Sequence, residues 1–549
     1  MASTRAFRRA ILLTGTTGIG FGRVLDIARK LVGPECVDKF EDYLVLGPCG
    51  DVEQYIRYLN ISGGEAKTRF REALSRMVEK LRQNNCSDVV IAIHLTYLTG
   101  YSITPNPVIP EVLRIADDVR VIHVADDWYD VIVRIARSTV AREKDCERRE
   151  LGFTIDPETV VNWRSADFSL TSLSEEMGAS RWYLIAVKHT PSTFERLLEE
   201  VLGRRSYLKA YISHPIRGVR RLYVELKCLV ASEMGWNALS KPPLRTFSKF
   251  PLVTVIEGFK SYVKNLLEKT YGGAILFEPT TIDELLIDAT RLEGEGCGAA
   301  ELLVEPSMEA RWPYPQDTIA EYDYGESMEK ALKGALIALR GFGLSAYMEL
   351  LSRTGRKSKA MEGFRTALEY ALLRFKEAIE EQIEARDYKY IEQSDILIAS
   401  VPALAYCDNG GKVHLAIMPS RGVSDEVKRA MALSKPIYFY ILPLDLKVLL
   451  KSLEGYTRLD SNYGDRIAGK LAEAFGAGGD ELRACPKPLS LSEPGSLTRN
   501  LASGVFSEVP PSARIMIMPS ITSVDVLESP ATVAGFYSAS KPITLPPKY

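Results

Sequence analysis

The 549-residue chain lacks several features that would identify a compartment or a class of partner. It has no run of about 18 apolar residues, so the sequence predicts no membrane-spanning helix and no membrane partner. Its 69 basic and 71 acidic side chains nearly cancel, and the net charge of -2 predicts no nucleic-acid partner. Its eight cysteines form no Cys-x-x-Cys pair, and no histidine lies at zinc-finger spacing. We therefore expect reduced cysteines, no metal ion and a cytoplasmic location.

Segments with the pattern of buried strands alternate with amphipathic helices over most of the chain. Strands are predicted at 10–14, 43–46, 88–93, 119–124, 182–188, 207–212, 274–277, 395–400, 413–418 and 436–441. Helices are predicted at 21–32, 65–83, 128–142, 191–202, 254–270, 326–386 and 424–433. Strands that alternate with helices are typical of a parallel sheet covered by helices on both faces. The sequence therefore predicts an α/β protein.

The alternation falls into two series, separated near Gly203. We predict two parallel-sheet, three-layer (Rossmann-like) domains with a helical insertion and an irregular C-terminal extension. The domain bounds are residues 1–203, residues 204–446 with the insertion at about 285–360, and residues 447–549.

A glycine-rich turn follows the first predicted strand, where nucleotide-binding folds place a phosphate loop. Phe21 and Gly22 stand where phosphoryl transfer requires a Lys and then a Ser or Thr, to hold the phosphates and Mg²⁺. With strands 88–93 and 119–124, the turn resembles a degenerate archaeal adenylate-kinase-like P-loop NTPase. We expect this domain to bind a second nucleotide without turning it over, or to act as a scaffold. The candidate nucleotide-binding residues are Gly15, Thr16, Thr17, Gly18, Gly20 and Arg23.

Three polar segments adjoin strands of the second series. Residues 211–218 leave its first strand, residues 386–395 lead into a buried strand, and residues 419–430 open a helix. Loops after parallel strands meet at the carboxyl edge of the sheet, so the first and third segments are expected to converge there. Cleavage of an N-glycosidic bond needs a carboxylate to trap the positive charge that develops on the sugar, and a second acid to help the base leave.

The third segment is suited to both a nucleophile and a phosphate site. Glu426 would lie in the first helical turn if Ser424 were the N-cap, and the helix dipole there favours an ionised carboxylate. The free N–H groups of this turn, with a guanidinium from the first segment, would form a phosphate cradle. The predicted phosphate-binding residues are Ser420, Gly422, Arg217 and Gly218.

Together the three segments resemble the nucleoside 2-deoxyribosyltransferase-like superfamily, most closely its 2'-deoxynucleoside 5'-monophosphate N-glycosidase branch. The matching positions are Tyr211, Ile216, Arg217, Gly218, Asp387, Asp395, Ser420, Gly422, Val423, Glu426, Arg429 and Ala430. The resemblance implies that Glu426 is the nucleophile, Asp387 its partner acid and Tyr211 a contact to the sugar. It also implies that Ser420 contacts the 5'-phosphate of a nucleotide substrate. Transferases of the superfamily tend to have Asp at this position, so the serine favours hydrolysis.

The resemblance further implies that no cofactor is needed and that the protein is a homo-oligomer, paired through helices such as 360–386. Two other interpretations of the sequence remain open. The chain could be a nucleotide-binding sensor without catalysis, or a structural assembly protein built from enzyme-derived folds. A single pocket holding Glu426, Asp387 and Tyr211 would favour the enzyme.

Overall fold

The computed structural model divides the chain into two compact units. The first comprises residues 1–206, 280–284 and 314–386, and the second comprises residues 207–279, 285–313 and 387–549. The residues that the structure describes are 5–16, 19, 21–44, 63–99, 102–128, 131, 157–187, 189–234, 250–279, 357–407, 413–453, 461–476 and 513–540. Most of the predicted insertion at 285–360 therefore lies outside the described residues, as does most of the predicted helix 128–142.

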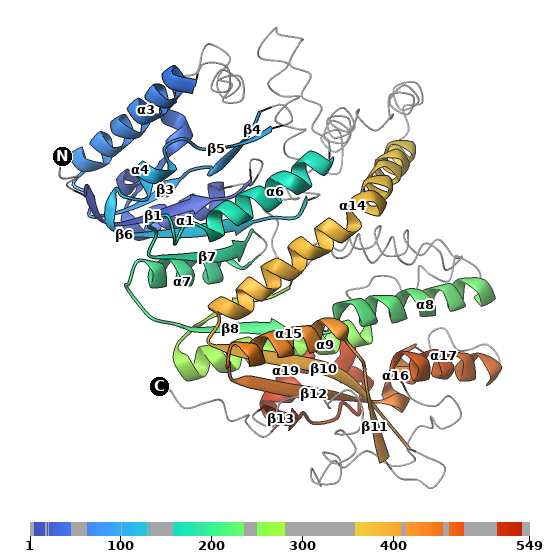
Figure 1. The fold of residues 1–549 in the computed structure, drawn as a ribbon. Helices are drawn as coiled ribbons and strands as arrows, with labels where there is room; N and C mark the ends of the chain where they lie inside the picture. The colour runs from blue at the N-terminus through green and yellow to red at the C-terminus, as the bar shows by residue number, and fades with distance from the viewer. Residues whose placement is uncertain are drawn as a thin grey trace. The chain divides into compact units, whose positions relative to one another are not determined.

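The first unit is built on a parallel sheet with the strand order β2-β3-β1-β6-β7 (Figure 1). Its strands are β1 (Phe7–Thr14), β2 (Val37–Lys39), β3 (Asp88–Ala92), β6 (Ala116–Ala125) and β7 (Arg181–Ala186), with a separate antiparallel pair, β4 (Thr96–Thr99) and β5 (Ser102–Pro105). Its helices include α1 (Gly22–Val32), α3 (Gly63–Gln83), α4 (Ile109–Val112), α6 (Pro157–Ser172) and α7 (Pro191–Val201). Residues 10–13 of β1 are completely buried, as expected for a central strand covered on both faces.

The edge of this sheet differs from the predicted strand at 43–46, of which the structure describes only Tyr43 and Leu44, and neither lies in a strand. The edge strand is β2, and Tyr43 instead ends a 3-10 turn, η2 (Phe40–Tyr43). The Tyr43 hydroxyl donates a hydrogen bond to Asp38 at 2.5 Å, and Lys80 pairs with the same carboxylate at 3.0 Å. These polar contacts fix the turn. A three-residue strand is also too short to give a recognisable alternation of apolar and polar residues.

The expectation of reduced cysteines is also wrong. Cys36, in the 3-10 turn η1 (Pro34–Cys36), forms a disulfide with Cys86, just before β3. Cys228 and Cys407 are disulfide-bonded as well, and no cysteine in the described part of the chain is free. Disulfides persist in oxidising compartments and in intracellular proteins of hyperthermophiles, so cysteine usage no longer supports a cytoplasmic location. None of the described helices is both long and apolar enough to cross a bilayer.

The second unit contains a sheet with the order β13-β12-β10-β8-β9, in which all neighbours are parallel. Its strands are β8 (Leu208–Ser213), β9 (Ala274–Phe277), β10 (Ile396–Cys407), β12 (Ile437–Asp445) and β13 (Arg514–Ile517), and β11 (Val413–Ile417) pairs antiparallel with β10. Its helices include α8 (Ile216–Met234), α9 (Pro251–Tyr271), α15 (Arg421–Ala432), α16 (Leu446–Leu453), α17 (Ser461–Ala474) and α19 (Pro530–Ala539). Helix α14 (Lys357–Gln393) belongs to the first unit up to Arg386 and to the second from Asp387. Parallel sheets flanked by helices confirm the predicted α/β, Rossmann-like class.

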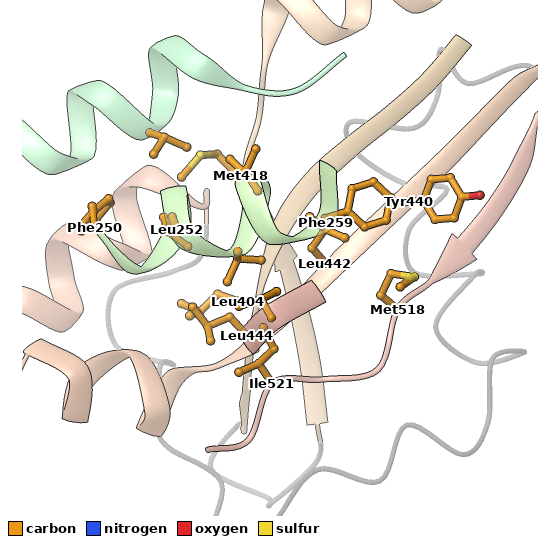
Figure 2. Close-up of a cluster of buried hydrophobic side chains, with 14 of the residues drawn as sticks. Phe250, Leu252, Phe259, Leu404, Met418, Tyr440, Leu442, Leu444, Met518 and Ile521 are labelled. Carbon is orange, nitrogen blue, oxygen red and sulfur yellow. The ribbon is translucent and has the colours of Figure 1, made fainter. Parts of the chain in front are cut away.

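One face of the second sheet carries the main hydrophobic core of this unit. Figure 2 shows Phe250, before α9, and Leu252 and Phe259 of that helix beside strand residues such as Leu404 and Leu442. Met518 and Ile521, from the C-terminal segment, complete the same cluster. The described parts of residues 447–549, predicted as an irregular extension, therefore add a strand and helices to this unit.

Helix α19 of the C-terminal segment packs closely against α9. A methyl group on Gly258 would lie 2.4 Å from Val533 Cβ and 2.9 Å from Pro530 O. Only a glycine allows the two helices to approach this closely.

Gly258→Ala is therefore expected to destabilise the second unit by roughly 1–3 kcal/mol, the usual cost of overpacking a close-packed core. Guanidinium unfolding of the two proteins would measure the loss. Gly535→Ala is the matched control, because a methyl group there meets nothing within 4 Å. It should be neutral or slightly stabilising, since alanine is the better helix former. Equal stability of both variants would contradict the close contact.

Candidate active site

Strand β8 presents alternate side chains to opposite faces of its sheet. Ala210 and Ile212 lie in the hydrophobic core, while Tyr211 and Ser213 point to the other face, as the two-residue period of a strand requires. Both Tyr211 and Ser213 are completely buried. The strand ends at Ser213, so these two side chains lie at the carboxyl edge, where parallel sheets bind ligands.

Helix α15 carries Glu426 toward this face, but not in the predicted way. Its N-cap is Ser420, whose hydroxyl accepts a hydrogen bond from the Val423 N–H at 3.4 Å, and the helix begins at Arg421. Glu426 is therefore the sixth residue of the helix, not a residue of the first turn. The helix dipole acts mainly within the first turn, so the predicted dipole effect on Glu426 is wrong.

Two hydroxyl groups hold the Glu426 carboxylate instead. Tyr211 Oη donates a hydrogen bond to Glu426 Oε1 at 2.6 Å, and Ser213 Oγ donates to Oε2. Only 9% of Glu426 is exposed, so these bonds replace most of the water that a carboxylate would otherwise bind. Hydrogen bonds to an ionised group are short and strong, and one donor to each oxygen fixes the orientation of the carboxylate.

The end of α14 packs against the same pair. The Tyr390 ring stacks on Tyr211 with centroids 6.3 Å apart, and the Arg429 guanidinium lies 5.5 Å from the centre of the Tyr388 ring. Arg429 follows Glu426 by one helical turn. Asp387 is buried and shares a helix face with Tyr390, three residues further on. The contacts of Tyr390 with Tyr211 and of Tyr388 with Arg429 place the end of α14 beside β8 and α15.

Asp395 has a different position and a structural role. Its carboxylate accepts a hydrogen bond from the Lys209 N–H at 2.8 Å, and the Lys209 ammonium lies 3.5 Å away. It thereby joins the start of β10 to the start of β8.

The predicted phosphate-binding residues come from two helix starts that approach each other. A methyl group on Gly218 would lie 3.4 Å from Met418 Sδ and 3.6 Å from Pro419 O, so α8 begins against the turn before α15. Arg217 is exposed in the first turn of α8, and Gly422 has open space beside it in the first turn of α15. Ser420 already caps α15 with its hydroxyl. The first turn of α8 is therefore a neighbour of the turn that leads into α15, and the first N–H groups of a helix have no partner within the helix.

On the opposite face of β8, His214 is buried beside an ionic cluster. Lys260 pairs with Glu257 at 3.0 Å and with Glu278 at 2.5 Å. Burial, reinforced by the positive charge of Lys260, lowers the pKa of His214 to about 3. The imidazole is therefore neutral at physiological pH, and it cannot serve as a proton donor for the reaction.

The N-terminal turn is only partly described. A methyl group on Gly15 would lie 2.4 Å from Val124 O, so the close approach of β1 and β6 already requires a glycine there. Thr16 is buried. Thr17, Gly18, Gly20 and the side chain of Arg23 lie outside the described residues.

The sequence-based interpretation missed one residue of the site, Ser213. Its signal was available, because it follows Tyr211 by two residues on a predicted strand and so faces the same side. Within the described ranges, no three His, Cys, Asp or Glu side chains come together to hold a metal ion.

No protein-family model matches the chain, and no curated protein is significantly similar to it. A functional proposal therefore rests on the geometry around Glu426 and on the resemblance of the three short segments.

Proposed function

We propose that the second unit cleaves the N-glycosidic bond of a (deoxy)nucleoside 5'-monophosphate, with Glu426 as the nucleophile. The observation that carries this proposal is the buried Glu426 carboxylate, held by one hydroxyl group at each oxygen at the carboxyl edge of the sheet. The two hydroxyl donors fix the orientation of this carboxylate at the edge of the sheet where ligands bind. A negative charge fixed there suits a cationic transition state.

The reaction would proceed in two balanced steps. A Glu426 oxygen forms an ester bond with C1' of the sugar while the C1'–N bond breaks, and the base leaves with a proton from Asp387. Water then attacks C1', giving its hydroxide to the sugar and its proton to Asp387, and Glu426 leaves as a carboxylate. Tyr211 and Ser213 would keep the carboxylate aimed at C1' in both steps.

The 5'-phosphate would bind where α8 and α15 begin. First-turn N–H groups of both helices, the exposed Arg217 guanidinium and the open space beside Gly422 support this placement. Glu426 lies one turn further along α15, so the two negative charges would occupy adjacent positions. Resemblance to the nucleotide N-glycosidases favours the same arrangement.

The test measures, by chromatography, the release of free base from a panel of ribo- and deoxyribonucleoside 5'-monophosphates. Intact protein is compared with Glu426→Ala at equal concentration. Release from at least one nucleotide, lost in the variant, would support the proposal and identify the substrate. Folded protein that releases no base from any nucleotide would reject it.

For the first unit, we infer that it binds a second nucleotide without phosphoryl transfer, or that it serves as a scaffold. Phe21 occupies the position of the phosphate-binding lysine, and it is buried with its ring 5.5 Å from that of His94. A buried aromatic ring cannot supply the positive charge that the β- and γ-phosphates require. Nucleotide binding without hydrolysis, measured on the whole chain, would agree with this role.

A further inference from the structure

The first unit contains a cavity of about 260 Å³ that the proposed glycosidase reaction does not use. It opens at the carboxyl ends of three parallel strands. Thr16 follows β1, Asp126 follows β6 and Ala186 ends β7, and all three line it. Helix α6 and residues 378–386 of α14 form the remaining walls, and every lining residue belongs to the first unit. Parallel sheets commonly bind ligands at this edge.

The size of the cavity limits the ligand. The volume of the cavity approaches the lower end of the roughly 300–1,000 Å³ of typical small-molecule sites, so the cavity suits a small organic ligand. The floor is apolar, formed by side chains such as Ile19, Val131 and Leu184. A compact ligand with an aliphatic part fits this description.

The polar groups on the walls are rich in hydrogen-bond acceptors. Asp126 and Asp127 follow β6 and are 6% and 1% exposed. Gln382 donates from Nε2 to Val161 O and to Ser165 Oγ, both at 2.7 Å. Because Val161 O can only accept, these bonds fix the orientation of the amide. Its buried Oε1 then has no hydrogen-bond partner among the described residues.

His123 adds another acceptor to the cavity. Its Nδ1 lies 3.0 Å from Thr171 Oγ1, and that hydroxyl donates its own proton to the Asp167 carbonyl at 2.8 Å. His123 must therefore donate from Nδ1, which leaves Nε2 as an acceptor. Burial, together with the charge of Arg164, lowers the pKa of His123 to about 3, so the ring is neutral at physiological pH.

We propose that this cavity binds a small aliphatic compound through a protonated amine. An ammonium group donates three hydrogen bonds, and the acceptor-bearing residues Asp126, Asp127, Gln382 and His123 all line the cavity. Asp126, Asp127 and Glu381 bring negative charge to the lining, which attracts an ammonium group. Arg164 and Arg386 also line the cavity, on the helical walls, where they suit the carboxylate of an amino acid. Amino acids and simple diamines share the required chemistry.

Calorimetric titration of the full-length chain tests the proposal. The probes are L-leucine, which has both an amine and a carboxylate, and 1,4-diaminobutane, which has only amines. Binding of leucine alone would identify an amino-acid site that uses the arginines, and binding of the diamine would identify an amine site. No binding of either amine would overturn the proposal.

Two variants assign the binding to the cavity. Asp126→Asn removes a charge-assisted acceptor and is expected to weaken amine binding at least tenfold. Glu176→Gln, an exposed acid outside the cavity, should leave the affinity unchanged. Ala378→Phe fills the space from a half-buried position and should abolish binding, even if the Asp126 variant fails to fold. Unchanged affinity in a folded Ala378→Phe protein would place the amine elsewhere and reject the site.

Discussion

Glu426→Gln is expected to lower kcat/KM for base release by at least a thousandfold, a loss of roughly 4 kcal/mol of transition-state stabilisation. An amide oxygen is a poor nucleophile and carries no negative charge to meet the cationic sugar. The substitution keeps the size of the side chain, and the hydroxyls of Tyr211 and Ser213 can rotate to bond either amide atom. Activity should therefore fall without a comparable loss of stability. Initial rates and a thermal unfolding curve would measure both.

The matched control is Asp425→Asn, which changes the neighbouring acid on the same helix. Asp425 is partly exposed and pairs with Arg421 and Lys428 on the surface, at 3.4 and 3.6 Å. Such pairs contribute little, so this variant should retain nearly full activity.

Mass spectrometry of acid-quenched protein should also find a sugar phosphate on the peptide that contains Glu426. More than a tenth of the original activity in Glu426→Gln would exclude this residue as the nucleophile.

Strand ends were the part of the site that sequence patterns could place. Tyr211 lies near the end of a predicted parallel strand, and this places it at the carboxyl edge of the sheet. The expectation that Glu426 also follows a parallel strand is wrong, because β11, the strand before its helix, pairs antiparallel with β10 and returns the chain to that edge. The capping residue was harder, because Ser420 and Ser424 are both good caps at plausible positions. Only the backbone decides between them. Ser420 is extended, with φ -144° and ψ 111°, and the helix has already begun by Ser424.

Other features of the fold depend on contacts between distant residues. Helices α6 and α8 were not predicted, and in α8 a stretch rich in Arg and Lys conceals the apolar face. In the sequence, Gly258 resembles any glycine within a helix, and only its contact with α19 shows why a larger residue does not fit. The parallel pairing of β13 with β12 likewise joins segments more than seventy residues apart. A local sequence pattern cannot predict these contacts, because the residue with which each of them packs or pairs lies far away in the chain.

The disulfide is a further long-range feature, and its removal is expected to have the largest effect on stability. Cys36 and Cys86 are 50 residues apart, and closing a loop of that length restricts the unfolded chain by about 4 kcal/mol in the chain-entropy treatment. The bond ties η1, just before β2, to the start of β3. The double variant Cys36→Ala/Cys86→Ala should therefore destabilise the first unit by roughly 2–4 kcal/mol.

Denaturant unfolding under non-reducing conditions would measure this loss, with hydrogen exchange of the β2 and β3 peptides as a local readout. The double variant is better than a reducing agent, which would also break the bonds of Cys228 and Cys407 in the second unit. Exchange should accelerate in β2 and β3, while β8 and β10 serve as the internal control and should not change. Because the two units can unfold separately, the local readout assigns the loss to the correct one. A change below about 0.5 kcal/mol, typical of an unremarkable surface substitution, would mean that the bond does not constrain the unfolded chain in solution.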